Sequence, residues 1–115
     1  MVDDLYEAAE SARRSVEVLL ELGGGASTSF VEKASDAIAH LVDNSLRVLA
    51  RPSDGNGVDA RHCGSCAVGA LDALLKSRLV DEEQQRAEVS RAYFYLRDAK
   101  TAARPRVDVA AGSPA

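Results

Sequence analysis

Apolar residues recur at intervals of three and four positions in four segments of this chain, which is the spacing of one face of an α-helix. Three of the segments run from about Ser29 to Leu49, from Asp59 to Leu79 and from Asp81 to Ala103. The clearest repeat lies in the segment from Asp3 to Leu22 and consists of Leu5, Ala9, Ala12, Val16 and Leu19. No segment alternates apolar and polar residues between hairpin turns, as a half-exposed strand would. The sequence therefore predicts an all-α fold, a small antiparallel bundle of three to four helices.

Residues that begin helices stand before three of these segments. Ser29 and Glu32 have the spacing of a capping box and are predicted to open the second helix. Asp59 and Asp81 are predicted to cap the third and fourth helices, because an Asp side chain in that position accepts a hydrogen bond from a free backbone amide. The glycines at 23–25 are predicted to end the first helix.

The chain of 115 residues has the length of one small domain. Residues 1–104 are predicted to form that domain, and residues 105–115 are predicted to form a flexible C-terminal tail because they lack helical spacing. Residues 51–59 are rich in turn formers and are predicted to be the longest interior loop. The acidic first residues do not resemble a secretory signal, and no apolar run approaches the roughly 18 residues that a membrane span needs. We therefore expect a cytoplasmic protein with no membrane partner.

The predicted core is rich in alanine and poor in large side chains. The chain has 20 alanines and no Trp, so its helices can approach closely but bury little apolar area per residue. In the second helix, Phe30 and Leu49 are predicted to belong to the core stripe. Tyr93, Phe94 and Tyr95 are consecutive and cannot all face one core, so we predict Phe94 and Tyr95 as partner-binding residues. The thin core and the surplus aromatic residues together predict a homo-oligomer.

The charge distribution argues against a nucleic-acid partner. The formal net charge is −4, which gives no general attraction to a polyanion. Arg97, Lys100, Arg104 and Arg106 gather where the fourth helix ends, and their attraction to the negative end of the helix dipole accounts for them. Binding of an acidic partner or of a nucleic-acid phosphate at this cluster remains an alternative. His40 lies among charged residues and is predicted to belong to a solvated helix face.

The segment Arg61-His62-Cys63-Gly64-Ser65-Cys66 brings several chemically capable side chains together. On a helix, His62, Cys63 and Cys66 would share one face with the predicted cap Asp59. Simple burial of the two cysteines is the first interpretation, because free cysteine is among the most buried residue types. A redox pair is the second. The third is a zinc site in which Cys63, Cys66 and His62 supply three ligands, and His40, Asp59 or a neighbouring chain supplies the fourth.

Two catalytic interpretations of the cysteine motif are excluded by its neighbours. Cys-Gly-Ser-Cys resembles the sequence around the nucleophile of papain-type cysteine proteases, but no His follows Cys66 to act as a base and Ala67 stands where that family has an aromatic residue. Attachment of a c-type haem requires His directly after the second Cys. No phosphate loop or pair of catalytic carboxylates is present either, so no catalytic residue is predicted.

The sequence thus predicts a small helical protein–protein interaction module, an accessory, assembly or regulatory subunit that self-associates and carries no cofactor. The alternative prediction is a thiol redox or zinc-binding helical protein that uses the motif from His62 to Cys66.

Overall fold

The computed structural model describes residues 5–22, 28–50 and 59–104, and within these ranges the chain is helical with no strand. The four helices are α1 (Leu5–Leu22), α2 (Thr28–Ala50), α3 (Ala60–Ser77) and α4 (Glu82–Ala103). The predicted all-α fold is confirmed. The predicted tail at 105–115, the glycines at 23–25 and all of the predicted loop except its last residue lie outside the described residues.

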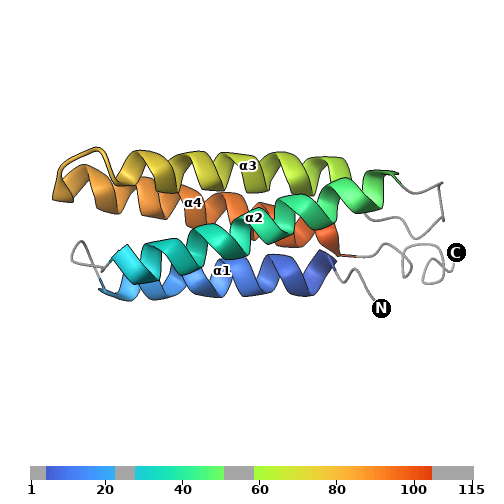
Figure 1. The fold of residues 1–115 in the computed structure, drawn as a ribbon, viewed down its shortest axis with the longest axis horizontal. Coiled ribbons are helices and arrows are strands. Elements are labelled where there is room, and N and C mark those ends of the chain that lie inside the picture. The colour runs from blue at the N-terminus through green and yellow to red at the C-terminus, as the bar shows by residue number, and fades with distance from the viewer. Residues whose placement is uncertain (1–4, 23–27, 51–58, 105–115) are drawn as a thin grey trace, which may run out of the picture.

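The helices form an antiparallel four-helix bundle (Figure 1). Going around the bundle, α1 packs on α2, α2 on α3 and α3 on α4, and α4 returns to pack on α1. Each connection reverses the chain direction, so helices that follow one another in sequence lie side by side. None of the described helices combines the length and the hydropathy that a membrane crossing requires.

The predicted caps of α3 and α4 are confirmed. The Asp59 carboxylate accepts a hydrogen bond from the backbone N–H of His62 at 3.0 Å, and the Asp81 carboxylate accepts one from Gln84 at 2.9 Å. The backbone N–H of Asp59 also donates to the carbonyl oxygen of Ala102 at 3.1 Å, which ties the start of α3 to the end of α4. The bonds of Asp59 fix the point at which α3 begins, and they therefore set the position of the cysteine motif along the bundle.

Two details of the predicted second helix are wrong. The helix begins at Thr28, so Ser29 lies within its first turn and not before it as a cap. Phe30 and Leu49 are both more than two-fifths exposed and do not belong to the core. The apolar stripe of α2 is wider than the sector that its neighbours cover, and these two residues lie at its edges.

The core combines a few large aliphatic side chains with many alanines. Its largest fully buried apolar side chains are Leu19, Ile38, Leu41, Leu74, Leu96 and Val16. Between them are the buried alanines Ala9, Ala12, Ala34, Ala60, Ala67, Ala70, Ala73, Ala92, Ala99 and Ala103. Within the described residues, every buried side-chain nitrogen or oxygen has a hydrogen-bond partner. The alanine-rich core that the sequence predicts is therefore present, and the buried polar side-chain atoms of the described residues are all hydrogen-bonded.

Two glycines of α3 lie where neighbouring helices approach most closely. A Cβ atom at Gly64 would lie 3.1 Å from the Cβ of Ser45 on α2, and one at Gly69 would lie 2.9 Å from the ring of Tyr95 on α4. Both distances are shorter than an ordinary van der Waals contact. Glycine at these positions lets α2 and α4 pack directly against the backbone of α3.

Candidate functional site

The two cysteines of α3 are free thiols that lie in the core. Burial raises the pKa of Cys63 to about 11, although a side-chain hydrogen bond with Ser45 acts in the opposite direction. Burial also raises the pKa of Cys66, and the nearby negative charges of Asp98 and Asp59 add to that effect. Both side chains are therefore neutral thiols at neutral pH, whereas a reactive redox pair needs a thiolate.

The structure brings His62 to Cys66 from outside the core. His62 is exposed, and its Nε2 atom lies 3.7 Å from the Sγ atom of Cys66. The third predicted ligand, Cys63, is fully buried one turn before Cys66. In the described part of the chain, no group of three or more His, Cys, Asp or Glu side chains is arranged to hold a metal ion. The geometry thus contains a His–Cys pair at one edge of the core.

We expect both thiols to resist alkylation by iodoacetamide at pH 8 in the folded protein and to react at once in denaturant. The reason is that the raised pKa values keep the thiolate fraction small and burial blocks access. Because the folded-state pKa of Cys63 is above its unfolded value, its contribution to stability is present below about pH 8.5 and is lost towards pH 11. Mass spectrometry of alkylated protein measures the reaction. Rapid labelling of Cys66 in the native state would contradict this expectation.

The two predicted partner-binding residues differ in their surroundings. Phe94 is 51% exposed, and the Arg97 guanidinium lies over its ring at 4.9 Å from the centroid. Tyr95 is half-buried because its ring packs against Gly69 of α3. Of the two aromatic side chains, Phe94 is therefore the more exposed. The sequence indicated that these residues point in different directions but not which of them packs on a neighbour.

The basic cluster at the end of α4 is occupied by contacts within the bundle. The Nζ atom of Lys100 lies 2.8 Å from the Glu10 carboxylate on α1. The Arg104 guanidinium lies over the ring of Tyr6 at 5.9 Å. Arg106 lies outside the described residues. These cations therefore join α4 to α1, which reduces their availability to a polyanion.

Glu10 is the centre of an ion-pair network between α1 and α4. Its carboxylate accepts hydrogen bonds from Arg13 at 3.0 Å and Arg14 at 2.9 Å, in addition to its contact with Lys100. These cations hold the pKa of Glu10 well below its usual range. The network is local to the α1–α4 contact and leaves the cysteine motif untouched.

Replacing Glu10 with Gln is expected to remove part of the acid sensitivity of the fold. Because the folded-state pKa of Glu10 is lowered, its contribution to stability is present above the unfolded pKa of about 4.3 and is lost as the pH falls below it. The variant should be less stable than the wild type at pH 7, and the difference should shrink at pH 2 to 3. Urea unfolding at both pH values measures this. Glu21→Gln, at an exposed position of the same helix, controls for the loss of one carboxylate. A difference that persists at low pH would contradict the ion-pair argument.

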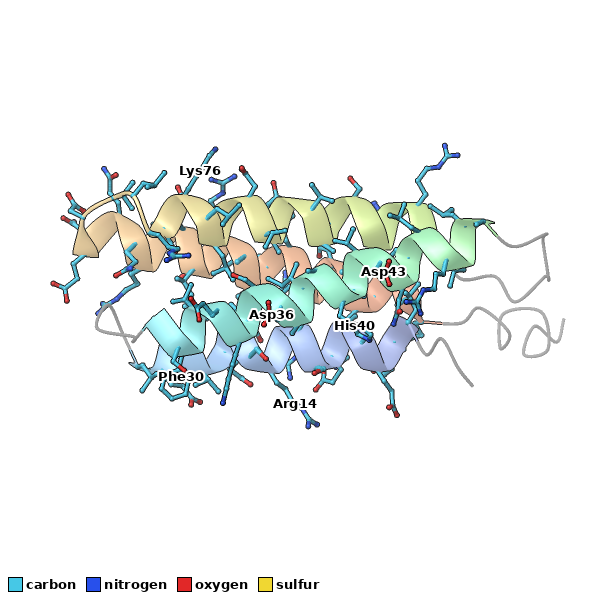
Figure 2. All side chains as sticks on the ribbon, in the orientation of Figure 1. Arg14, Phe30, Asp36, His40, Asp43 and Lys76 are labelled. Atoms are coloured by element: carbon cyan, nitrogen blue, oxygen red, sulfur yellow. The ribbon has the colours of Figure 1, made fainter. Side chains whose placement is uncertain are left out.

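The predicted polar face of α2 is present. Figure 2 shows Asp36, His40 and Asp43 projecting outward from α2. Asp43 pairs with Arg47 at 2.6 Å, and the Nε2 atom of His40 lies 3.5 Å from the Nδ2 atom of Asn44. His40 therefore belongs to a solvated face and is not brought to the cysteines.

A row of exposed apolar side chains on α2 and α3 was not identified from the sequence. Leu46 and Leu49 of α2 are 59% and 47% exposed, and Val68 and Leu75 of α3 are 54% and 50% exposed. The spacing of Leu46, Leu49, Val68 and Leu75 at helical intervals was visible in the sequence, but it merges with the core stripe. The burial of the neighbouring residues is needed to separate the two.

No model of a known protein family, no curated protein and no solved structure matches this chain.

Proposed function

We propose that this chain is a small helical protein–protein interaction module, a cytoplasmic accessory, assembly or regulatory subunit that self-associates and needs no cofactor. The observation that carries the proposal is the row of half-exposed Leu46, Leu49, Val68 and Leu75. Complete burial of such a side chain contributes about 1.5–3 kcal/mol. Four of them on two adjacent helices favour association much more than scattered single residues would.

The alanine-rich core supports the same proposal. Each buried alanine removes less apolar area from water than a leucine would, so the stability of an isolated bundle has a narrow margin over chain entropy. Burying the exposed row in an interface adds apolar area without changing the core. A partner therefore contributes directly to the stability of the fold.

Light scattering coupled to size-exclusion chromatography tests self-association over about 1 to 100 micromolar protein, the range in which moderately tight complexes dissociate. We expect a mass of at least twice 12.2 kDa at the upper end of this range. The melting temperature should rise with protein concentration, because association stabilises the folded state. A constant monomer mass at every concentration would overturn the proposed self-association.

The second candidate function is thiol or zinc chemistry at His62 and Cys66. The observation that favours it is the distance of 3.7 Å between His62 Nε2 and Cys66 Sγ, which suits two ligands of one tetrahedral zinc ion. Metal analysis and a free-thiol count on protein purified without chelator test it. Stoichiometric zinc that is lost in His62→Ala would support a metal site, whereas two free thiols and no metal would remove this candidate.

A further inference from the structure

The exposed apolar row forms one continuous face along the line where α2 meets α3, called here the α2/α3 face. It consists of the exposed Leu46 and Leu49 of α2 and Val68 and Leu75 of α3, together with the half-buried Val42 of α2 and Leu71 of α3. The close approach of Ser45 to Gly64 marks this line. Val42 and Leu49 lie one turn before and after Ser45, and Val68, Leu71 and Leu75 follow Gly64 at intervals of one turn each. Both rows therefore flank the same contact.

Large and small side chains are arranged in opposite order on the two helices. On α2, the small Ser35 and Ala39 precede the large Leu46 and Leu49 along the chain. On α3, the small Gly64 and Ser65 precede the large residues of the face. Because the helices are antiparallel and Ser45 is level with Gly64, each end of the face pairs a bulky row on one helix with a small row on the other.

We propose that a second copy of this chain covers the α2/α3 face, related by a two-fold axis parallel to the helices. This inference deepens the proposed function by naming its partner and interface. The rotation places α2 of one copy on α3 of the other at the same level. Leu46 and Leu49 then lie over the partner's exposed Ser65, beside its contact between Gly64 and Ser45, while Ser35 and Ala39 accept the partner's Leu71 and Leu75. Bulky side chains thus meet small ones at both ends of the face, while Val42 and the partner's Val68 meet at its middle.

The charges beside the face favour this axis over a perpendicular one. Along the outer edge of α2 are Glu32, Asp36 and Asp43, with Arg47 as the only cation of this edge. On the outer edge of α3, two cations, Arg61 and Lys76, accompany one acid, Asp72. A perpendicular two-fold axis would place the acidic edge of α2 on its own copy. The parallel axis places that edge against the net positive edge of α3, which is the complementary arrangement.

The size of the face fits a modest dimer. Two adjacent helices form a face about 20 Å wide, and the 18 residues of α3 give it a length of about 27 Å. The footprint is therefore roughly 500 Å² per copy, which reaches the roughly 1,000 Å² in total that marks a specific interface. We expect a dissociation constant in the micromolar range for an interface at this lower end.

The first experiment replaces Leu46 or Leu75 with Arg and measures self-association by sedimentation. Each variant should dimerise at least about 100-fold more weakly than the wild type, because a desolvated guanidinium would be left without a partner. Circular dichroism confirms that the variants remain helical. Phe94→Arg is the matched control, since Phe94 is equally exposed but lies on α4, and it should dimerise as the wild type does.

The second experiment tests the axis with engineered cysteines under mild oxidation. Val42→Cys protein mixed with Val68→Cys protein should form a disulfide-linked heterodimer, because these two positions oppose one another across the parallel axis. Val68→Cys alone should give no more linked dimer than the wild type, whose own thiols are buried. Cross-linking of Val68→Cys with itself would overturn the parallel axis in favour of the perpendicular one.

The outcomes separate this inference from the proposed function. A wild-type protein that dimerises, and whose dimer survives Leu46→Arg and Leu75→Arg or is lost in Phe94→Arg, would overturn the α2/α3 interface but keep self-association. A wild-type protein that is monomeric at all concentrations would overturn both.

Discussion

Replacing Leu96 with Ala is expected to lower the free energy of unfolding by about 2–5 kcal/mol. Leu96 is fully buried in α4, and few other side chains of its size fill this alanine-rich core. The many alanines of the core have no flexible atoms that could move into the space, so most of the cavity should remain. The cost is therefore expected in the upper half of that range. Urea unfolding with a circular dichroism readout measures it.

Phe94→Ala is the matched control, because it removes a larger side chain two residues away on the same helix. Phe94 is half-exposed, and its contacts are with the Tyr93 ring and the Arg97 guanidinium at the surface. We expect this change to cost less than about 1 kcal/mol. A larger loss from Phe94→Ala than from Leu96→Ala would show that the two faces of α4 have been assigned the wrong way round.

Gly64→Leu is expected to destabilise the bundle by about 3 kcal/mol, at the upper end of typical overpacking costs. Its Cβ atom alone would lie 3.1 Å from the Cβ of Ser45. That atom of Ser45 is fixed to the backbone, so α2 and α3 must separate to admit the remaining carbons. Leucine has a better helix propensity than glycine, which restores at most about 1 kcal/mol of the lost stability. Thermal unfolding at a fixed low protein concentration measures the net effect.

Two further variants isolate the crowding at Gly64. Gly64→Ala adds one carbon, which requires a shift of a few tenths of an ångström at Ser45. The gain in helix propensity of about 1 kcal/mol should nearly offset the energetic cost of that shift. Ala87→Leu adds a large side chain at an exposed position of α4 and should change stability by less than about 0.5 kcal/mol. If Gly64→Leu were as stable as the wild type, the close approach of α2 to α3 would be refuted.

Features that depend on one helix alone were predictable from the sequence. The five residues of the α1 repeat are all buried, and Asp59 and Asp81 cap their helices as predicted. In each case the physical cause, a helical period or a side chain that accepts an amide hydrogen, acts within a few residues. The C-terminal end of α4 before Pro105 follows from the same kind of local rule.

Features that depend on the pairing of helices were not predictable. Phe30 and Leu49 carry the period of the α2 core, but whether an edge residue is covered depends on the position of the next helix. The contact between Glu10 and Lys100 joins residues that are far apart in sequence. At the cysteine motif, the spacing predicted a shared face, yet the depth of Cys63 and the exposure of His62 follow from where α2 and α4 lie against α3.

The many buried alanines of the core also affect how the stability of the bundle depends on temperature. Alanine has no side-chain torsion to immobilise, so the core becomes ordered at little entropic cost. The same residues expose little apolar surface when the chain unfolds, which keeps the heat-capacity change of unfolding small. A small heat-capacity change makes the curve of stability against temperature broad and flat. The bundle should therefore lose little of its modest stability on cooling and resist cold denaturation.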